Sequence, residues 1–223
     1  MKITYIHHSC FLVETDRFYY LFDYVKGQLP ELDIEKPIFV LSSHSHGDHY
    51  NPSVFPLLEA AGMKRVRAIL SDDIIPPANV HVLQAAPEQV YDFDRDLTLT
   101  TFRSTDLGVA FLIEDQNTIL YHAGDLNDWV WDEETDDYNQ EMTANYRREI
   151  DSLSRKLGKK EIDAAFVVLD PRQEQDYDRG LCYFLDSVSA RAVYPMHYWE
   201  EPAIIGKFLK DHPQYTAQIQ KTE

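Results

Sequence analysis

The sequence contains Ser43-His44-Ser45-His46-Gly47-Asp48-His49, a short segment with three histidines and one aspartate. It follows Ile38–Leu41, a fully apolar run that is typical of a strand buried on both faces. We therefore expect these histidines to lie in a loop just past a buried strand. Imidazole and carboxylate groups are good ligands for zinc and neighbouring first-row metals. The alternative is a hydrated loop with coincidental histidines, but we judge chance assembly of H-x-H-x-D-H to be roughly a one-in-a-thousand event.

The spacing within this segment predicts two groups of ligands. Side chains two residues apart in an extended chain point to the same face, so His44 and His46 can reach one metal together. Gly47 permits a sharp turn, which would let Asp48 and His49 face a second position. One loop cannot complete two metal sites, so ligands from distant parts of the chain are required.

The best distant candidates also follow predicted strands. Asp125 comes after a predicted hairpin, and its carboxylate could bridge two cations. His197 follows a late strand and could complete the second position. His122, three residues before Asp125, is open to three interpretations: a ligand, a partner of a ligand, or a buried hydrogen-bonded histidine.

Short β-branched and aromatic runs recur along the whole chain, with helices between them. Besides Ile38–Leu41, the expected strands are Ile3–Ile6, Phe11–Glu14, Phe18–Tyr24, Val66–Leu70, Val80–Leu83, Tyr91–Arg103, Val109–Glu114, Thr118–His122, Ala164–Leu169, Ala192–Pro195 and a short one at the end of the chain. The expected helices are one capped by Asn51 and ending near Ala61, one that follows a long loop within Asn127–Asn145 and ends near Leu157, and two more over Gly180–Val188 and Ala203–Leu209. This order suggests stacked sheets with helices outside them.

These landmarks together resemble the metallo-β-lactamase superfamily. They are H-x-H-x-D-H after a buried strand, Gly124-Asp125 after a hairpin, and a late Pro195-Met196-His197. The opening Thr4–Glu14, which includes His8-Ser9-Cys10-Phe11-Leu12-Val13-Glu14, further resembles the subgroup of the L-ascorbate-6-phosphate lactonases and related hydrolases. The resemblance implies an α/β (α+β) fold, a four-layer αββα sandwich with metals at one edge between its two sheets.

The resemblance also implies a ligand set. His44 and His46 would hold the first metal, Asp48, His49 and His197 the second, and Asp125 would bridge them. The family usually supplies one more histidine to the first metal, but the matching segment here, Arg103–Gly108, has none. Asp106 could replace it as an oxygen ligand. Otherwise the first site is weak or empty, and the protein binds one metal at the second site.

Other residues have two possible roles each near such a centre. Asp23 would hold ligand imidazoles through their second nitrogen, or else ends a strand in a turn. His8 would touch substrate or donate a proton, or else is structural. Substrate-binding candidates are Tyr198 and Trp199, which could instead pack in the core, and Arg172, whose guanidinium could pair with a phosphate or carboxylate.

The expected function is hydrolysis of a small ester, lactone, amide or phosphodiester by a metal-activated hydroxide. Asp125 would position the hydroxide, and Asp48 or His8 would assist the leaving group. The expected cofactor is Zn²⁺, one or two per chain, with Mn²⁺ or iron as alternatives. Two other functions stay open: redox chemistry at iron, and metal binding without catalysis. The acidic stretch Asn127–Asn145 either covers the cleft or is a surface insertion.

The composition limits the classes of partner. The net charge is −17, with 21 Lys and Arg against 38 Asp and Glu, which disfavours nucleic acid and anionic membranes. Two cysteines, Cys10 and Cys182, make no disulfide framework. The start MKITYIHHSC is too polar for a signal peptide, and no apolar run could span a bilayer. We expect a single domain over residues 1–223, a cytoplasmic location and a small-molecule substrate, and the oligomeric state stays undetermined.

Overall fold

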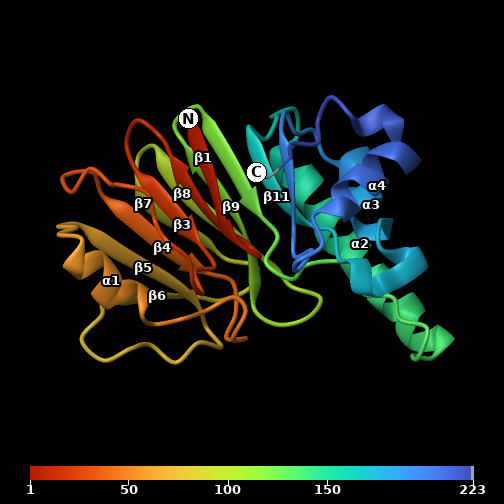
Figure 1. Ribbon diagram of the computed structural model, residues 1–223, viewed down its shortest axis with the longest axis horizontal. Coiled ribbons are helices and arrows are strands. Elements are labelled where there is room, and N and C mark those ends of the chain that lie inside the picture. Colours follow the sequence, from red (N-terminus) through yellow and green to blue (C-terminus); the bar gives the residue numbers. More distant parts are fainter. Residues whose placement is uncertain (222–223) are drawn as a thin grey trace. The chain divides into compact units, whose positions relative to one another are not determined.

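A computed structural model describes residues 1–221 of the chain. Its contacts divide the chain into two compact units, Met1–Ala86 and Pro87–Glu223, and each unit contains one six-stranded sheet. The single domain over residues 1–223 stays a prediction. The expected mixture of helices and two sheets is confirmed, and Figure 1 shows the elements of each unit.

The sheet of the first unit has its strands in sequence order, from β1 to β6. The elements are β1 (Lys2–His7), β2 (Cys10–Glu14), β3 (Tyr19–Phe22), β4 (Ile38–Ser42), α1 (Val54–Ala60), β5 (Val66–Ser71) and β6 (Val82–Ala85). All five residues of β4 are buried, as its unbroken apolar sequence predicted. Ile38 and Val40 pack in one cluster with Val54 and Leu58 of α1, so the helix covers one face of this sheet.

The sheet of the second unit has the order β12-β11-β10-β9-β8-β7. Its elements are β7 (Val90–Asp94), β8 (Leu97–Arg103), β9 (Val109–Asp115), β10 (Thr118–His122), α2 (Asp136–Leu157), β11 (Ala164–Val168), α3 (Arg179–Ser187), β12 (Val193–Met196), α4 (Ala203–Asp211) and two 3₁₀ helices, Pro171–Asp176 and Pro213–Tyr215. In Figure 1 the helices α2, α3 and α4 gather on the same side of β11. The side chain of Thr135 caps α2 by accepting a hydrogen bond from the amide of Tyr138.

Several expected boundaries of strands and helices are wrong. The run Tyr91–Arg103 is a hairpin of β7 and β8 rather than one strand, because the chain turns at Asp96, whose amide bonds to the carboxylate of Asp94. The predicted cap at Asn51 lies two residues too early: α1 begins at Val54 with Ser53 in the cap position, and the side chain of Asn51 accepts a hydrogen bond from the amide of Ser53 in the turn before the helix. The predicted strand Val80–Leu83 lies two residues later.

The second unit agrees with one expectation and differs from another. The loop within Asn127–Asn145 runs into a helix, as predicted, and this helix, α2, begins at Asp136. The predicted terminal strand is instead a single bridge between Ile219 and Val193.

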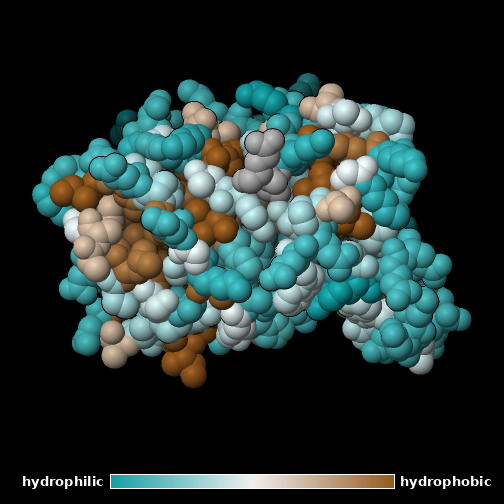
Figure 2. Space-filling model, in the orientation of Figure 1, coloured by the Kyte–Doolittle hydropathy of each residue, from teal (hydrophilic) through white to brown (hydrophobic). Residues whose placement is uncertain are grey.

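Among residues 1–221, no helix combines the length and the hydrophobicity needed to cross a bilayer. Hydrophilic side chains dominate the face drawn in Figure 2, where hydrophobic ones form separate groups.

Candidate functional site

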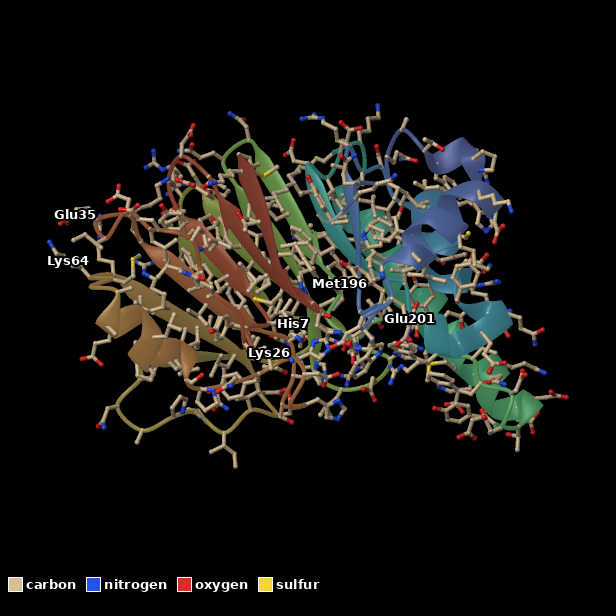
Figure 3. The ribbon with its side chains drawn as sticks, in the orientation of Figure 1. His7, Lys26, Glu35, Lys64, Met196 and Glu201 are labelled. Atoms are coloured by element: carbon tan, nitrogen blue, oxygen red, sulfur yellow. The ribbon has the colours of Figure 1, made fainter. Side chains whose placement is uncertain are left out.

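The predicted metal-binding residues of the first unit lie past the carboxyl ends of strands that run in the same direction. β1 and β3 are both antiparallel to β2, and β4 is parallel to β3, so their carboxyl ends share one edge of the sheet. His8 follows β1, Asp23 follows β3, and the segment Ser43–His49 follows β4. Figure 3 labels His7, the last residue of β1, at this edge, and the ion pair of Glu35 with Lys64 at the opposite end of the unit.

Four imidazole rings gather at this edge. The ring of His44 lies 4.6 Å from that of His46 and 4.2 Å from that of His49, and His8 lies 5.6 Å from His49 between ring centroids. His8 Nε2 and Asp48 Oδ2 are 3.5 Å apart. Two ligands held about 2.0–2.1 Å from one tetrahedral zinc ion are themselves about 3.4 Å apart. The spacing therefore suits a shared cation, and it makes His8 a candidate ligand as well as a candidate proton donor.

Asp23 orients the imidazoles of His49 and, through Ser43, His44. This fully buried carboxylate accepts hydrogen bonds from the Ser43 amide (2.7 Å), the Ser43 hydroxyl (2.7 Å) and His49 Nδ1 (2.8 Å). The Ser43 hydroxyl also lies 3.0 Å from His44 Nδ1. Because Nδ1 of both rings is engaged with an oxygen, Nε2 is the atom that each ring offers to a metal.

The backbone around these residues adopts unusual conformations. His8, Asp23 and His197 have φ angles of 52°, 45° and 63°, in the left-handed region that non-glycine residues rarely occupy. Such strain concentrates at functional sites. Gly124, just before Asp125, also has positive φ. The chain turns sharply at Gly47, as predicted, and hydrogen bonds from the amides of His49 and Tyr50 to the carbonyl of His46 close the turn. Its φ is not positive, so the turn does not need the conformational freedom of glycine.

The candidate residues of the second unit also follow strand ends. β8 and β10 are both antiparallel to β9, and β10, β11 and β12 are mutually parallel, so four carboxyl ends share one edge. Asp106 lies past β8, Asp125 past β10, Asp170 past β11 and His197 past β12. Figure 3 labels Met196, the last residue of β12, directly before His197.

His197 is held between two buried carboxylates. Its Nδ1 lies 2.9 Å from Asp170 Oδ2, and its Nε2 lies 3.4 Å from Asp125 Oδ1. Burial raises the pKa of Asp170, but hydrogen bonds from His197 and Arg172 outweigh it and lower that pKa to about 2. Asp170 is therefore ionised at neutral pH and accepts the Nδ1 proton. This orients His197 Nε2 together with Asp125, at a spacing that again suits two ligands of one cation.

Thr105 connects the loops that carry Asp106 and Asp125. Its hydroxyl donates to the carbonyl of Asn127 (2.6 Å) and accepts from the amide of Asn127 (3.0 Å). The carboxylates of Asp106 and Asp125 consequently approach within 4.8 Å of each other. Asp106 is exposed, whereas Asp125 is buried and its carbonyl accepts a hydrogen bond from the indole of Trp129. The pair can therefore offer oxygen ligands that are open to solvent on one side.

A pocket of about 160 Å³ opens beside these two carboxylates. It is lined by Thr105, Asp106, Asp125, Trp129, Trp131, Tyr138, Met142 and Arg172. Arg172 also forms an ion pair with Asp170 and lies 4.6 Å over the ring of Trp199. Tyr198 is buried, and Trp199 is 39% exposed. The wall of this pocket thus combines aromatic rings with one guanidinium.

His122 has a structural role. It is fully buried, and its Nδ1 accepts a hydrogen bond from the amide of Gly124 at 3.1 Å. Of the three interpretations of His122, the structure favours the buried hydrogen-bonded histidine.

A family model for a beta-lactamase superfamily domain matches residues 2–140, more than half of the chain. The chain belongs to the beta-lactamase superfamily. No protein with a curated sequence record matches it.

Solved structures support the metallo-β-lactamase fold of this superfamily member. Igni18, a metallo hydrolase from the archaeon Ignicoccus hospitalis, is 15% identical with a TM-score of 0.68, over 99% of this chain and 94% of its own. CmlA, a diiron β-hydroxylase from Streptomyces venezuelae, is 13% identical with a TM-score of 0.65, over 98% of this chain and 52% of its own. A protein described as a metal-dependent hydrolase from Parabacteroides distasonis is 17% identical with a TM-score of 0.63, over 98% and 90%. At these identities the similarity shows the fold alone.

Asp170 is the residue of this superfamily member that sequence reasoning missed. The sequence placed Asp170-Pro171-Arg172 after a buried strand, but only Arg172 received a role. The available signal was position, because Asp170 follows β11 as Asp125 follows β10 and His197 follows β12. The order of the strands along the chain does not show which strand ends are neighbours in the sheet.

Replacing Asp170 by asparagine is expected to weaken metal binding by about 10–100-fold, because Asp170 fixes the orientation and tautomer of His197. Metal affinity, measured by titration with a chelator of known affinity, checks this. Asp137→Asn, a change at an exposed position in α2, is the matched control. Equal affinity in Asp170→Asn and the control would show that Asp170 does not position a ligand.

Proposed function

We propose that this protein is a metal-dependent hydrolase that uses a metal-activated hydroxide on a small ester, lactone or phosphoester. The proposed ligands are His44, His46, Asp48, His49, Asp106, Asp125 and His197. The observation that carries the proposal is that three buried imidazoles each have Nδ1 within hydrogen-bond distance of an oxygen. Nδ1 of His44, His49 and His197 lies 2.8–3.0 Å from a hydroxyl or carboxylate oxygen, the arrangement that typically orients histidine ligands.

A bound divalent cation would lower the pKa of a coordinated water molecule towards neutrality and polarise the oxygen of the group under attack. The protein's own residues would supply orientation and proton transfer. Asp125, held by Trp129 and Thr105, would position the attacking hydroxide. His8 and Asp48, whose side chains lie 3.5 Å apart, would pass a proton to the leaving group.

The pocket beside Asp106 and Asp125 supports a substrate that carries an anionic group. Arg172 pairs with Asp170, but its side chain is still half exposed in this pocket. A guanidinium binds phosphate or carboxylate through two parallel hydrogen bonds. The stacked rings of Trp129 and Trp131, 5.9 Å apart, would provide an apolar wall. The proposed substrate class is therefore a small phosphorylated or carboxylated lactone or ester. The charge of −17 disfavours a nucleic acid.

Iron-dependent oxidation is the second candidate function. The similarity of the fold to that of the diiron hydroxylase CmlA favours it, because mixed imidazole and carboxylate ligands also suit iron. We rank it below hydrolysis because the half-exposed guanidinium of Arg172, in the pocket beside Asp106 and Asp125, suits an anionic ester or lactone.

Removal and return of the metal tests the proposal. The protein is stripped with a chelator and reloaded separately with Zn²⁺, Mn²⁺ or Fe²⁺. Each form is then assayed against lactones, phosphodiesters and carboxylate esters, in pairs with and without a phosphate. We expect no hydrolysis by the stripped protein, recovery with zinc or manganese, and a lower KM for the phosphorylated member of each pair.

The same experiment can contradict the proposal. A visible absorption band with iron, together with oxygen consumption and no hydrolysis by any form, would support the oxidation candidate instead. Tight metal binding without either activity would leave a metal-binding protein that is not an enzyme.

A further inference from the structure

A second group of potential metal ligands lies between α3 and α4, on elements that carry none of the ligands proposed above. Asp178 immediately precedes α3, and Cys182 lies four residues later, on the same face of the helix. His212 lies directly after α4. One oxygen, one sulfur and one nitrogen from these residues lie within 4.8 Å of one another.

The contacts converge on a single atom of the imidazole. Cys182 Sγ lies 3.7 Å from His212 Nε2, and Asp178 Oδ2 lies 2.6 Å from the same nitrogen. A catalytic relay would instead use both ring nitrogens, one for the thiol and the other for the carboxylate. The sulfur and the oxygen thus both face His212 Nε2. A cation can bind where three such atoms lie together, by replacing the protons between them.

The thiol is unsuited to act as a nucleophile in this position. Burial, followed by the nearby charges of Asp178 and Asp186, raises the pKa of Cys182 to about 12, so the thiolate is scarce at neutral pH. Both cysteines have free thiols in the part of the chain that the structure describes. The sulfur therefore forms no disulfide within the described residues, and it becomes a thiolate at neutral pH only where a cation displaces its proton.

The imidazole is well positioned in advance. The ring of His212 packs 4.9 Å from that of Phe208, a fully buried residue, and 6.2 Å from that of Tyr215. The side chains of His212 and Asp178 are 24% and 22% exposed, so an ion can enter from solvent. The imidazole is therefore held in place by aromatic neighbours and is open to solvent on one side, as a binding site requires.

We propose that Asp178, Cys182 and His212 form a zinc-type site that links α3 to α4. A sulfur at about 2.3 Å and a nitrogen at about 2.0–2.1 Å from a tetrahedral zinc are about 3.6 Å apart, close to the distance between Cys182 and His212. The 2.6 Å between Asp178 and His212 is that of a hydrogen bond, and it would lengthen to about 3.4 Å when both bind the metal. A water molecule would fill the fourth position. Binding would release the thiol proton of Cys182 to solvent, and the Nε2 proton of a neutral His212 would exchange to Nδ1, so that Nε2, the thiolate and the Asp178 carboxylate face the metal.

Cobalt substitution tests this site independently of the proposed hydrolase centre. None of the ligands proposed for hydrolysis is a cysteine, so a sulfur-to-cobalt charge-transfer band in the near ultraviolet reports Cys182 alone. Co²⁺ is added to the metal-free full chain, and the band is measured in the wild type, Cys182→Ser, His212→Gln and Cys10→Ala. Cys10 is the other thiol and lies in the core of the first unit, which makes Cys10→Ala the matched control.

The expected result is a saturable band in the wild type and in Cys10→Ala that is lost in Cys182→Ser and weakened at least tenfold in affinity in His212→Gln. Circular dichroism verifies that the variants fold. Absence of the band in the folded wild type at saturating Co²⁺ would overturn the proposal, as would its persistence in Cys182→Ser. A protein that shows the band but hydrolyses nothing would retain this site and lose the function proposed above.

Discussion

Replacing His49 by alanine is expected to remove bound metal and lower kcat/KM on the order of a thousandfold or more. His49 is a fully buried imidazole whose Nδ1 is held by Asp23, so its Nε2 has one productive orientation. Loss of a residue that only supports a ligand already costs about 10–100-fold, and loss of the ligand itself should cost more. Elemental analysis of the purified variant and its kinetics check both expectations.

The control for this variant must separate metal loss from misfolding. His49→Ala leaves the buried Asp23 without one of its hydrogen bonds, which costs about 1–3 kcal/mol of stability. His46→Ala is the matched ligand variant, because His46 is exposed and its removal leaves the core intact. His81→Ala changes an exposed histidine that is not a proposed ligand. Normal metal content and activity in His46→Ala and His49→Ala alike would refute the ligand assignment.

Replacing Gly180 by alanine is expected to destabilise the protein by about 3 kcal/mol. A β-carbon there would lie 1.9 Å from Asn127 Oδ1 and 3.2 Å from the amide of Asp128. Asn127 cannot move away cheaply, because its amide group donates to Gln173 at 2.7 Å and its backbone bonds to Thr105. The Thr105 contacts support the loop of Asp125, so metal affinity should fall together with stability.

Thermal unfolding measures this effect against a helix glycine with open space around it. Gly206 lies within α4, and a β-carbon there would meet no atom within 4 Å. Gly206→Ala should therefore stabilise the protein by about 1 kcal/mol, the usual gain for alanine in a helix. The expected shifts in Tm are about −6 to −12 °C for Gly180→Ala and about +2 to +4 °C for Gly206→Ala. Shifts of the same sign in both variants would contradict the packing argument.

The sequence predicted the strands well because their hydrophobic patterns are local. The apolar run that became β4 and the hairpin of β9 and β10 needed no tertiary information. Boundaries were predicted less well where a side chain bonds to a nearby amide: Asp94 accepts from Asp96 in the turn between β7 and β8, and Asn51 accepts from Ser53 in the turn before α1. Such bonds compete with regular structure over two or three residues and leave the hydrophobic pattern almost unchanged.

Residues that act through others were the hardest to predict. Ser43-His44-Ser45-His46-Gly47-Asp48-His49 could be recognised from spacing, because ligands of one loop share a local pattern. The role of Asp170 depends on the pairing of β11 with β12, which places it 2.9 Å from His197. The group of Asp178, Cys182 and His212 likewise depends on how α3 and α4 meet, and its members are spread over 35 residues with no motif spacing.

The central claim is that both units of the chain contribute metal ligands. An anomalous difference map from crystals grown with Zn²⁺ and measured at the zinc absorption edge tests it most directly. The account predicts strong peaks about 2.0–2.1 Å from Nε2 of His49 in the first unit and from Nε2 of His197 in the second. A map in which either nitrogen lacks a metal within bonding distance at saturating zinc would contradict it.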